Sequence, residues 1–407
     1  MINNLLCFGL VFIPFYELIT TLFLPAQSIA FFDTRFPKEC VAFSIALAII
    51  LIGIYKGPIK PLKNIWLVLF IGFLVVNINK APVMPIDLGQ FDISNFWVWQ
   101  PFLNIIVYFF MLVVVASQDW TELNGKKIFN IMAWSGFIMS LYIFLQRAGF
   151  DQIFYVRSSE IVQGTAVPEL VGTLGAPSLV APFLAICLVP ALFIKKFIFA
   201  VSMAVAVFMI HSEFVIGGTI VALIVFYGFR NKKILFSLLF LAIFAVCTLY
   251  LIGKEDGRQY IFQDNGRFPV WSEIVTDLSS PLSMKDHRKY GMTGFGLGSY
   301  QYLFHVKHVS VWREAHNEYL ELAYCTGIIG LGLFAAALGA TLLVSFDQAK
   351  VNDQALVLMA VLSVLYFIAA GTFIWHLAVY QFYTIVVVGM IYQLRRFLYE
   401  NRISWKH

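Results

Sequence analysis

The amino-acid sequence predicts an all-α polytopic membrane protein. Three observations support this fold class: the composition, the length of the apolar runs and the placement of basic residues. Hydrophobic residues make up 60% of the chain and charged residues only 13%, and the mean hydropathy is +0.82. Soluble domains adding up to 407 residues would need far more charge on their surfaces. The apolar runs are continuous rather than alternating, which favours membrane helices over the strands of a membrane barrel.

The apolar runs predict about twelve transmembrane helices, each near the length that crosses about 30 Å of hydrocarbon. The expected spans are 5–24, 39–55, 64–79, 98–116, 128–147, 173–194, 197–211, 214–229, 234–252, 317–345, 355–374 and 376–394. They divide the chain into residues 1–252 with the first nine spans, a large loop at 253–316, and residues 317–407 with the last three spans and a tail. The stretch 197–229 also allows a different division, because both of its pieces are short.

Basic residues are distributed unevenly between the two sets of connecting segments. One set, with the tail, holds Lys56, Lys60, Lys63, Lys126, Lys127, Lys195, Lys196, Arg230, Lys232, Lys233, Lys350, Arg395, Arg396, Arg402 and Lys406. The short loops of the opposite set hold only Arg35, Lys38, Lys80, Arg147 and Arg157. Because basic residues accumulate on the cytoplasmic side, we expect both termini in the cytoplasm and the 253–316 loop outside it. Charges scattered singly or in pairs at helix ends do not predict a nucleic-acid partner.

The 253–316 loop concentrates the polar chemistry of the chain, including four of its seven histidines. His316 opens the tenth span and is a candidate general base, since histidine titrates near neutral pH; the alternative is an interfacial histidine that caps the helix. Arg267 suits a diphosphate, because its planar guanidinium donates two parallel hydrogen bonds; the alternative is a surface arginine beside a turn. Arg288 and Arg313 are further candidates that could also contact anionic lipid headgroups.

Two glycine-containing segments interrupt the expected helices. Gly294-Phe-Gly-Leu-Gly298 lacks the following Gly-Lys-Ser/Thr and the βαβ context of a nucleotide loop, so we expect a flexible turn that folds the loop back over the bilayer. Gly172-Thr-Leu-Gly-Ala-Pro177 breaks the start of the sixth span. Such a break either lines a cavity or forms an elbow that packing requires, and the sequence leaves both open.

Several classes of site have no motif in this sequence. There is no CxxC or HExxH, no paired-Asp metal motif and no nucleophile elbow, so neither a metal nor a cofactor is expected. The ionisable residues of the spans lie near the span ends, which weighs against an ion-coupled carrier.

The order of motifs resembles the O-antigen ligase and O-antigen polymerase superfamily. The matching elements are Gly266-Arg267 with Trp271, then Pro281, the glycines 294, 296 and 298, His316-Asn317-x-x-Leu320, and Gly327-x-x-Gly330. They cover about 266–332, and the segment 172–182 adds weaker support.

This resemblance implies a bacterial inner-membrane glycosyltransferase of the GT-C type with one large periplasmic loop. Such enzymes are metal-independent and transfer a glycan from undecaprenyl diphosphate to a sugar hydroxyl. The acceptor is lipid A-core in lipopolysaccharide ligases, or another lipid-linked glycan in polymerases. It implies that Arg267 grips the diphosphate and that His316 activates the acceptor. The substrate-binding candidates are Arg157, Arg288, Arg313, Asn317 and Trp271.

The chain departs from the family pattern at two places. The family often has an arginine just before the Gly-Thr element, where this chain has Pro168-Glu-Leu-Val171, and Arg157 is a possible substitute. It also often has Ser-Arg or Ser-Lys where this chain reads Ile216-Gly-Gly218. Because of these two departures, the sequence does not decide which residues bind the diphosphate of the donor. The alternatives are a polysaccharide or lipid-linked oligosaccharide flippase, with the loop as a gate, and a structural scaffold in an envelope-glycan complex.

Overall fold

A computed structural model describes most of the chain. The described residues are 2–23, 35–56, 59–60, 62, 64–77, 94–118, 122–150, 159–162, 165–168, 170, 172–174, 177–210, 212–229, 231, 267–279, 288–296, 299–300, 316–371 and 378–404. Only the backbone is described at 17–23, 35–39, 94–103, 122–124, 159–162, 165–168, 177–178, 213, 267–268, 288–290, 378 and 400–404.

The described residues are helical apart from one short hairpin. The helices are α1 (Ile2–Phe23), α2 (Arg35–Lys56), α3 (Ile65–Asn77), α4 (Ser94–Ser117), α5 (Glu122–Arg147), α6 (Pro177–Phe193), α7 (Phe197–Ile210), α8 (Glu213–Leu223), α10 (Arg267–Ser279), α11 (Arg288–Thr293), α13 (Glu318–Ala349), α14 (Asp353–Ala369) and α15 (Ala378–Ser404). A 3₁₀ turn at Gly172–Leu174 precedes α6, a π-helical turn at Ile224–Gly228 extends α8, and β1 (Ser159–Val162) pairs antiparallel with β2 (Thr165–Pro168). The helical fold class is therefore confirmed. Each expected span except 234–252, which lies outside the described residues, overlaps one of these helices; that they all cross a membrane stays a prediction.

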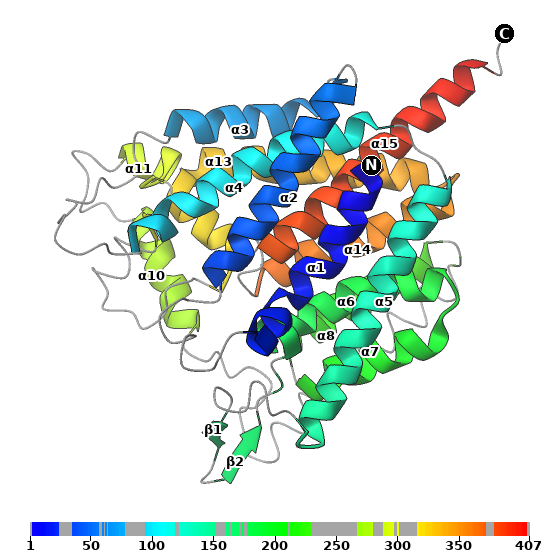
Figure 1. Ribbon diagram of the computed structural model, residues 1–407. Helices are drawn as coiled ribbons and strands as arrows, with labels where there is room; N and C mark the ends of the chain where they lie inside the picture. The colour runs from blue at the N-terminus through cyan, green and yellow to red at the C-terminus, as the bar shows by residue number, and fades with distance from the viewer. Residues whose placement is uncertain are drawn as a thin grey trace.

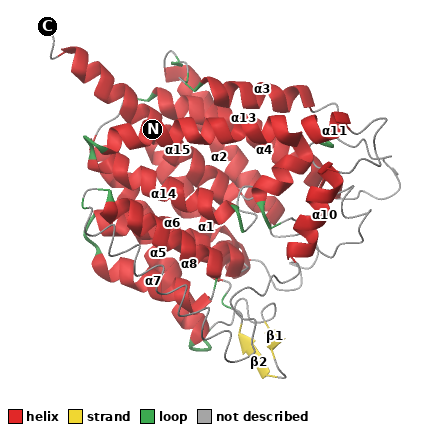
Figure 2. Cartoon of the chain, turned by 180° about the vertical axis from the view of Figure 1, so that it is seen from behind, coloured by secondary structure: helices red, strands yellow, loops and turns green. Residues whose placement is uncertain are grey.

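The helices form one bundle, in which α6 lies in the half that also holds α5, α7 and α8 (Figure 1). α6 packs against α5, α7, α8 and α14, while α15 packs against α4 and α13 against α3 and α14. α10 and α11 lie together at one end of the bundle, and the β1–β2 hairpin projects from it elsewhere (Figures 1 and 2). The candidate-bearing part of the 253–316 loop therefore covers one end of the bundle.

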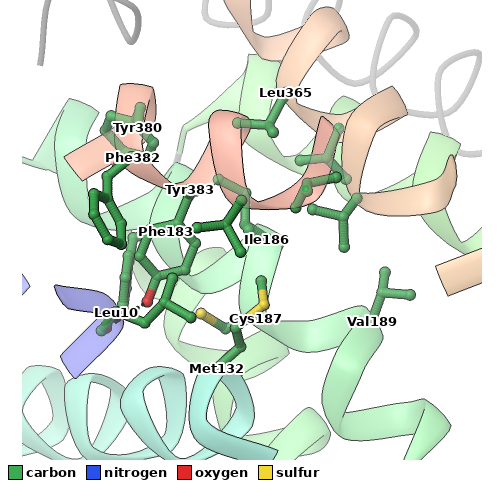
Figure 3. Close-up of a cluster of buried hydrophobic side chains, with 14 of the residues drawn as sticks. Leu10, Met132, Phe183, Ile186, Cys187, Val189, Leu365, Tyr380, Phe382 and Tyr383 are labelled. Atoms are coloured by element: carbon green, nitrogen blue, oxygen red, sulfur yellow. Dashed lines mark hydrogen bonds between the residues drawn. The ribbon is translucent and has the colours of Figure 1, made fainter. Parts of the chain in front are cut away.

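The main core surrounds α6, whose buried side chains lie among those of α1, α5, α14 and α15 (Figure 3). Hydroxyl groups accompany this apolar packing. Pro14 has no N–H, so the carbonyl of Leu10, one turn earlier in α1, loses its helical donor. The Tyr383 hydroxyl donates to that carbonyl oxygen at 2.7 Å, and the Ser135 hydroxyl approaches it at 3.5 Å. The Tyr380 hydroxyl likewise donates to the Leu179 carbonyl. Side chains from neighbouring helices thus satisfy backbone groups inside the core.

The elbow before α6 is a packed element. Gly172 has φ +55°, and a Cβ there would lie 2.5 Å from Val180 Cγ2. Its N–H donates to Gln146 Oε1 at 2.9 Å, and the Thr173 hydroxyl donates to the Pro14 carbonyl at 2.8 Å. Of the two interpretations open for 172–177, these contacts favour an elbow that packing requires.

The outward faces of several helices are as apolar as the core. α3 exposes Ile65, Trp66, Val68, Leu69, Val75 and Val76, and α7 exposes Phe197, Ile198, Val201, Val205 and Phe208. Two described helices, 125–147 and 318–349, are long and apolar enough to cross a membrane. Eight further apolar helices have 10–17 described residues. Helices that are apolar all round belong either to a large buried core or to a lipid environment.

Candidate functional site

The candidate residues fall on three helix starts. Arg267 is the first residue of α10, Arg288 is the first residue of α11, and His316 lies just before α13 begins at Glu318. Both α10 and α11 pack against α13. The structure therefore brings the backbone segments that carry these candidates onto one helix, while the side chains of Arg267 and Arg288, and all of Arg157 and Arg313, lie outside the described part of the chain.

The side chain of Asn317 caps the N-terminus of α13. Asn317 is the N-cap residue, and its Oδ1 accepts hydrogen bonds from the N–H groups of Tyr319 and Leu320, each at 3.1 Å. The helix cap considered for His316 is therefore wrong: Asn317 has that role, because Asn is among the best N-cap residues. Substrate binding by Asn317 stays a prediction.

His316 is buried and has an unusual backbone conformation. Its side chain is 9% exposed and its φ is +50°. The other non-glycine residue with positive φ among the described residues is Lys195. Lys195 ends α6 in an ordinary way: its N–H donates to Leu192 and the next N–H donates to Ala191, the pair of bonds that closes many helices with a left-handed residue. His316 stands two residues before α13 begins, and residues 301–315 on its N-terminal side lie outside the described part of the chain.

Two buried glutamates that follow His316 in the sequence were not proposed as site residues by the sequence analysis. Glu318 and Glu321 lie in the first turn of α13 and are 4% and 3% exposed. Buried glutamates are rare in proteins, and the N-terminus of a helix stabilises negative charge. Their spacing of three residues just after the Asn cap is the sequence signal that could have identified them, because it puts both near one face of the helix start.

α10 carries its candidates against a second, smaller core. Val270 and Ile274 are buried there with Tyr324 of α13, and Trp271 is half-buried against the same cluster. The Tyr324 hydroxyl lies 3.5 Å from Asp277 Oδ2 of α10. Trp271 thus helps to hold α10 onto α13, and a direct substrate contact by Trp271 stays a prediction.

α13 is broken at Gly327, the first glycine of the Gly327-x-x-Gly330 element that the resemblance singled out. Gly327 has φ +68° and ψ −173°, so the helical path stops and restarts there. The break removes the helical donors of the Tyr324 and Cys325 carbonyls, which would be the N–H groups four residues later. Phe295 N–H and Gly296 N–H donate to these two carbonyls instead, each at 2.9 Å.

This geometry corrects the expectation for the glycine-rich segment. Gly294 has φ +72°, and a Cβ there would lie 2.2 Å from the Cys325 carbonyl oxygen. The Phe295 ring stacks on Tyr324 with the centroids 4.6 Å apart. Residues 294–296 are therefore a packed segment and not a flexible turn, because the N–H groups of Phe295 and Gly296 donate to α13. Residues 297–298 of the glycine-rich segment lie outside the described part of the chain.

The position where the family pattern often has a cation is occupied by a close helix contact. A Cβ on Gly217 would lie 2.9 Å from the Phe367 ring, and a Cβ on Gly218 would lie 2.8 Å from Ile368 Cγ1. α8 and α14 approach closely through these glycines, as small residues permit between apolar helices. A long basic side chain at 217 or 218 would not fit this packing.

No family model matches this chain, and no curated protein matches it significantly. Within the described residues, no three His, Cys, Asp or Glu side chains form a group that could hold a metal ion. The functional proposal therefore rests on the residues of this chain and on their geometry.

Proposed function

We propose that this protein is an integral-membrane glycosyltransferase of the O-antigen ligase and polymerase type. It would take a glycan from undecaprenyl diphosphate and attach it to a sugar hydroxyl on the periplasmic face of a bacterial inner membrane. The membrane part of the proposal is supported by the apolar outward faces of α3 and α7 and by the two helices long enough to cross. It is also supported by hydroxyl groups that satisfy broken backbone inside the bundle, which lipid would otherwise leave without partners.

The observation that carries the enzymatic part is the start of α13. A buried histidine in a left-handed conformation precedes a capped helix whose first turn carries two buried glutamates. Backbone strain of this kind costs on the order of 1–3 kcal/mol and is concentrated at functional sites.

The chemistry follows from the leaving group. A new bond forms between the acceptor oxygen and the anomeric carbon while the bond from that carbon to the diphosphate oxygen breaks. Arg267 would neutralise the charge that develops on the diphosphate, and His316 would take the proton of the acceptor hydroxyl. Positioning and electrostatics would supply most of the rate, as in other transfers from good leaving groups.

The test is glycan transfer in membranes with a purified undecaprenyl-diphosphate-linked donor, with lipid A-core supplied or withheld. We expect Arg267→Ala to lose about a hundredfold or more in kcat, and His316→Ala to lose a similar factor. Lys350→Ala is the matched control, because Lys350 lies at the far end of α13, exposed and paired with Asp347 at 2.9 Å. Product that requires lipid A-core means a ligase, and longer lipid-linked chains without it mean a polymerase. Full activity of both variants in folded protein would refute the assignment.

A flippase is the second candidate, and the break in α13 is the observation that favours it. Discontinuous membrane helices form the substrate sites of many transporters. The two functions separate in vesicles: His316→Ala should abolish transfer in an enzyme, whereas a flippase should still move the lipid-linked glycan between leaflets.

A further inference from the structure

We infer that residues 292–296 form a positioning strap that fixes the direction of the His316-bearing end of α13, with Gly294 and Gly327 as the positioning residues. The inference rests on the proposed function for its catalytic consequence. The strap itself rests on described contacts alone. It assigns one shared role to two glycine motifs that lie 33 residues apart in the sequence (327 − 294).

The first step of the argument is that the two glycines meet backbone to backbone. A Cβ on Gly327 would lie 2.4 Å from the Met292 carbonyl carbon and oxygen and from Thr293 N. A Cβ on Gly294 would lie within 2.3 Å of the Cys325 carbonyl and of Thr326 N. Real Cβ atoms do not approach other heavy atoms this closely, and both glycines also have positive φ. Each glycine is therefore required by the segment on which the other lies.

The second step concerns the hydrogen bonds. The break leaves two consecutive carbonyls, those of Tyr324 and Cys325, without their helical donors, and two consecutive N–H groups of the strap replace them. The Tyr324 ring is held between Phe295 and Tyr300, with centroid distances of 4.6 and 5.9 Å. The last turn of the piece 318–326 is thus fixed by the strap on its backbone and on its side chain.

The third step connects the strap to the site. The piece 318–326 begins directly after His316 and Asn317, and it contains the buried Glu318 and Glu321. This piece is short, so a change of direction at its far end moves the histidine. Misplacing a catalytic group by about 1 Å can cost about a hundredfold in rate. A substitution in the strap would therefore lower kcat by displacing His316. Binding of the lipid-linked donor by Arg267, which lies on α10, would be unchanged.

The test compares four alanine variants of glycines near this site or on the same helix. Gly294→Ala and Gly327→Ala place a Cβ in the contact between strap and helix. Gly332→Ala and Gly339→Ala are matched controls in α13, where an added Cβ meets nothing within 4 Å. All four variants are purified as the full chain, and their fold is checked by size-exclusion profile and thermal unfolding. Phe295→Ala is a milder variant should a glycine variant fail to fold, with Phe295→Tyr as its conservative rescue.

Two readouts do not depend on glycan transfer. Hydrogen exchange measured by mass spectrometry should show the N–H groups of Phe295 and Gly296 protected in wild type and in the controls. Their exchange should be at least tenfold faster in Gly294→Ala and Gly327→Ala. Modification of the 9%-exposed His316 by diethyl pyrocarbonate should also accelerate severalfold in these two variants only. Unchanged protection in both would overturn the strap, and unchanged His316 reactivity after loss of protection would overturn its positioning role.

The catalytic consequence is a split between kcat and KM. In the same two variants we expect kcat for transfer to fall about a hundredfold, with little change in KM for the lipid-linked donor. Loss of protection with unchanged kcat would also overturn the positioning role. If wild type transfers no glycan, the proposed function fails, while hydrogen exchange and His316 modification still decide on the strap.

Discussion

Carbonyls lose their helical donors at Pro14 in α1 and at Gly327 in α13, and these freed carbonyls are satisfied in different ways. In α1, the Leu10 carbonyl accepts a hydrogen bond from the side chain of Tyr383 on α15. In α13, the Tyr324 and Cys325 carbonyls accept hydrogen bonds from main-chain N–H groups of the segment after α11. In α1, a side chain from another helix of the bundle thus replaces the missing helical donor. In α13, the replacement draws the backbone of the 253–316 loop into contact with a bundle helix.

This difference indicates at which contacts a substitution should displace a neighbouring segment and at which it should not. A side-chain hydroxyl can be lost or replaced without moving the two helices, because the helix backbones stay apart. A backbone-to-backbone contact has no such tolerance, since any added carbon must displace one of the two segments. The α6 core is therefore expected to respond to substitution in its stability, and the α13 break in the placement of the groups that it carries.

The largest effect that would test this contrast is expected at the elbow before α6. Gly172→Ala should lower the free energy of unfolding by about 3 kcal/mol, from the left-handed backbone and from overpacking against Val180. Gly149→Ala is the matched control: it has φ +82°, with nothing within 4 Å of the added Cβ, and should cost about 1 kcal/mol. Denaturation in detergent measures both. Equal costs would show that the elbow is not tightly packed.

A smaller effect is expected from the repair of α1. Tyr383→Phe leaves the Leu10 carbonyl with only the distant Ser135 hydroxyl at 3.5 Å and should cost about 1–3 kcal/mol. Pro14→Ala supplies an N–H one turn after Leu10, so the loss should be largely suppressed in the double variant. A double-mutant cycle measures this coupling. Additive effects would mean that the hydroxyl does not replace the missing helical donor.

The smallest effect concerns the helix cap beside His316. Asn317→Ala should cost about 1 kcal/mol, because the N–H groups of Tyr319 and Leu320 lose their acceptor. Asn317→Asp keeps the accepting oxygen and should retain the stability of wild type. Transfer activity then separates the two roles: an aspartate variant that is stable and active has only a cap at 317, and one that is stable and inactive has lost a substrate contact.

Part of this protein could be predicted from the sequence because the signals are local. Continuous apolar runs bounded by breakers located the helices, since the length and polarity of a segment decide whether it forms an apolar helix. The polar pair His316-Asn317 at the start of the tenth expected span marked where α13 begins, although the cap considered there was His316 and not Asn317. Gly294 and Gly327 were recognised as motif positions, because glycine at a fixed place usually answers a backbone requirement.

The rest was decided by contacts between segments far apart in the chain. No residue near Gly294 in the sequence indicates that the N–H groups of Phe295 and Gly296 will donate to carbonyls of a helix 30 residues later (324 − 294). A flexible turn was therefore the expectation for this segment. The burial of Glu318 and Glu321 and the glycines that replace an expected cation at 217–218 depend on which helices pack around them. Local sequence fixes where a helix begins and ends, because its hydrogen bonds are local. Only the tertiary structure decides which distant group takes the place of a hydrogen bond that the helix has lost.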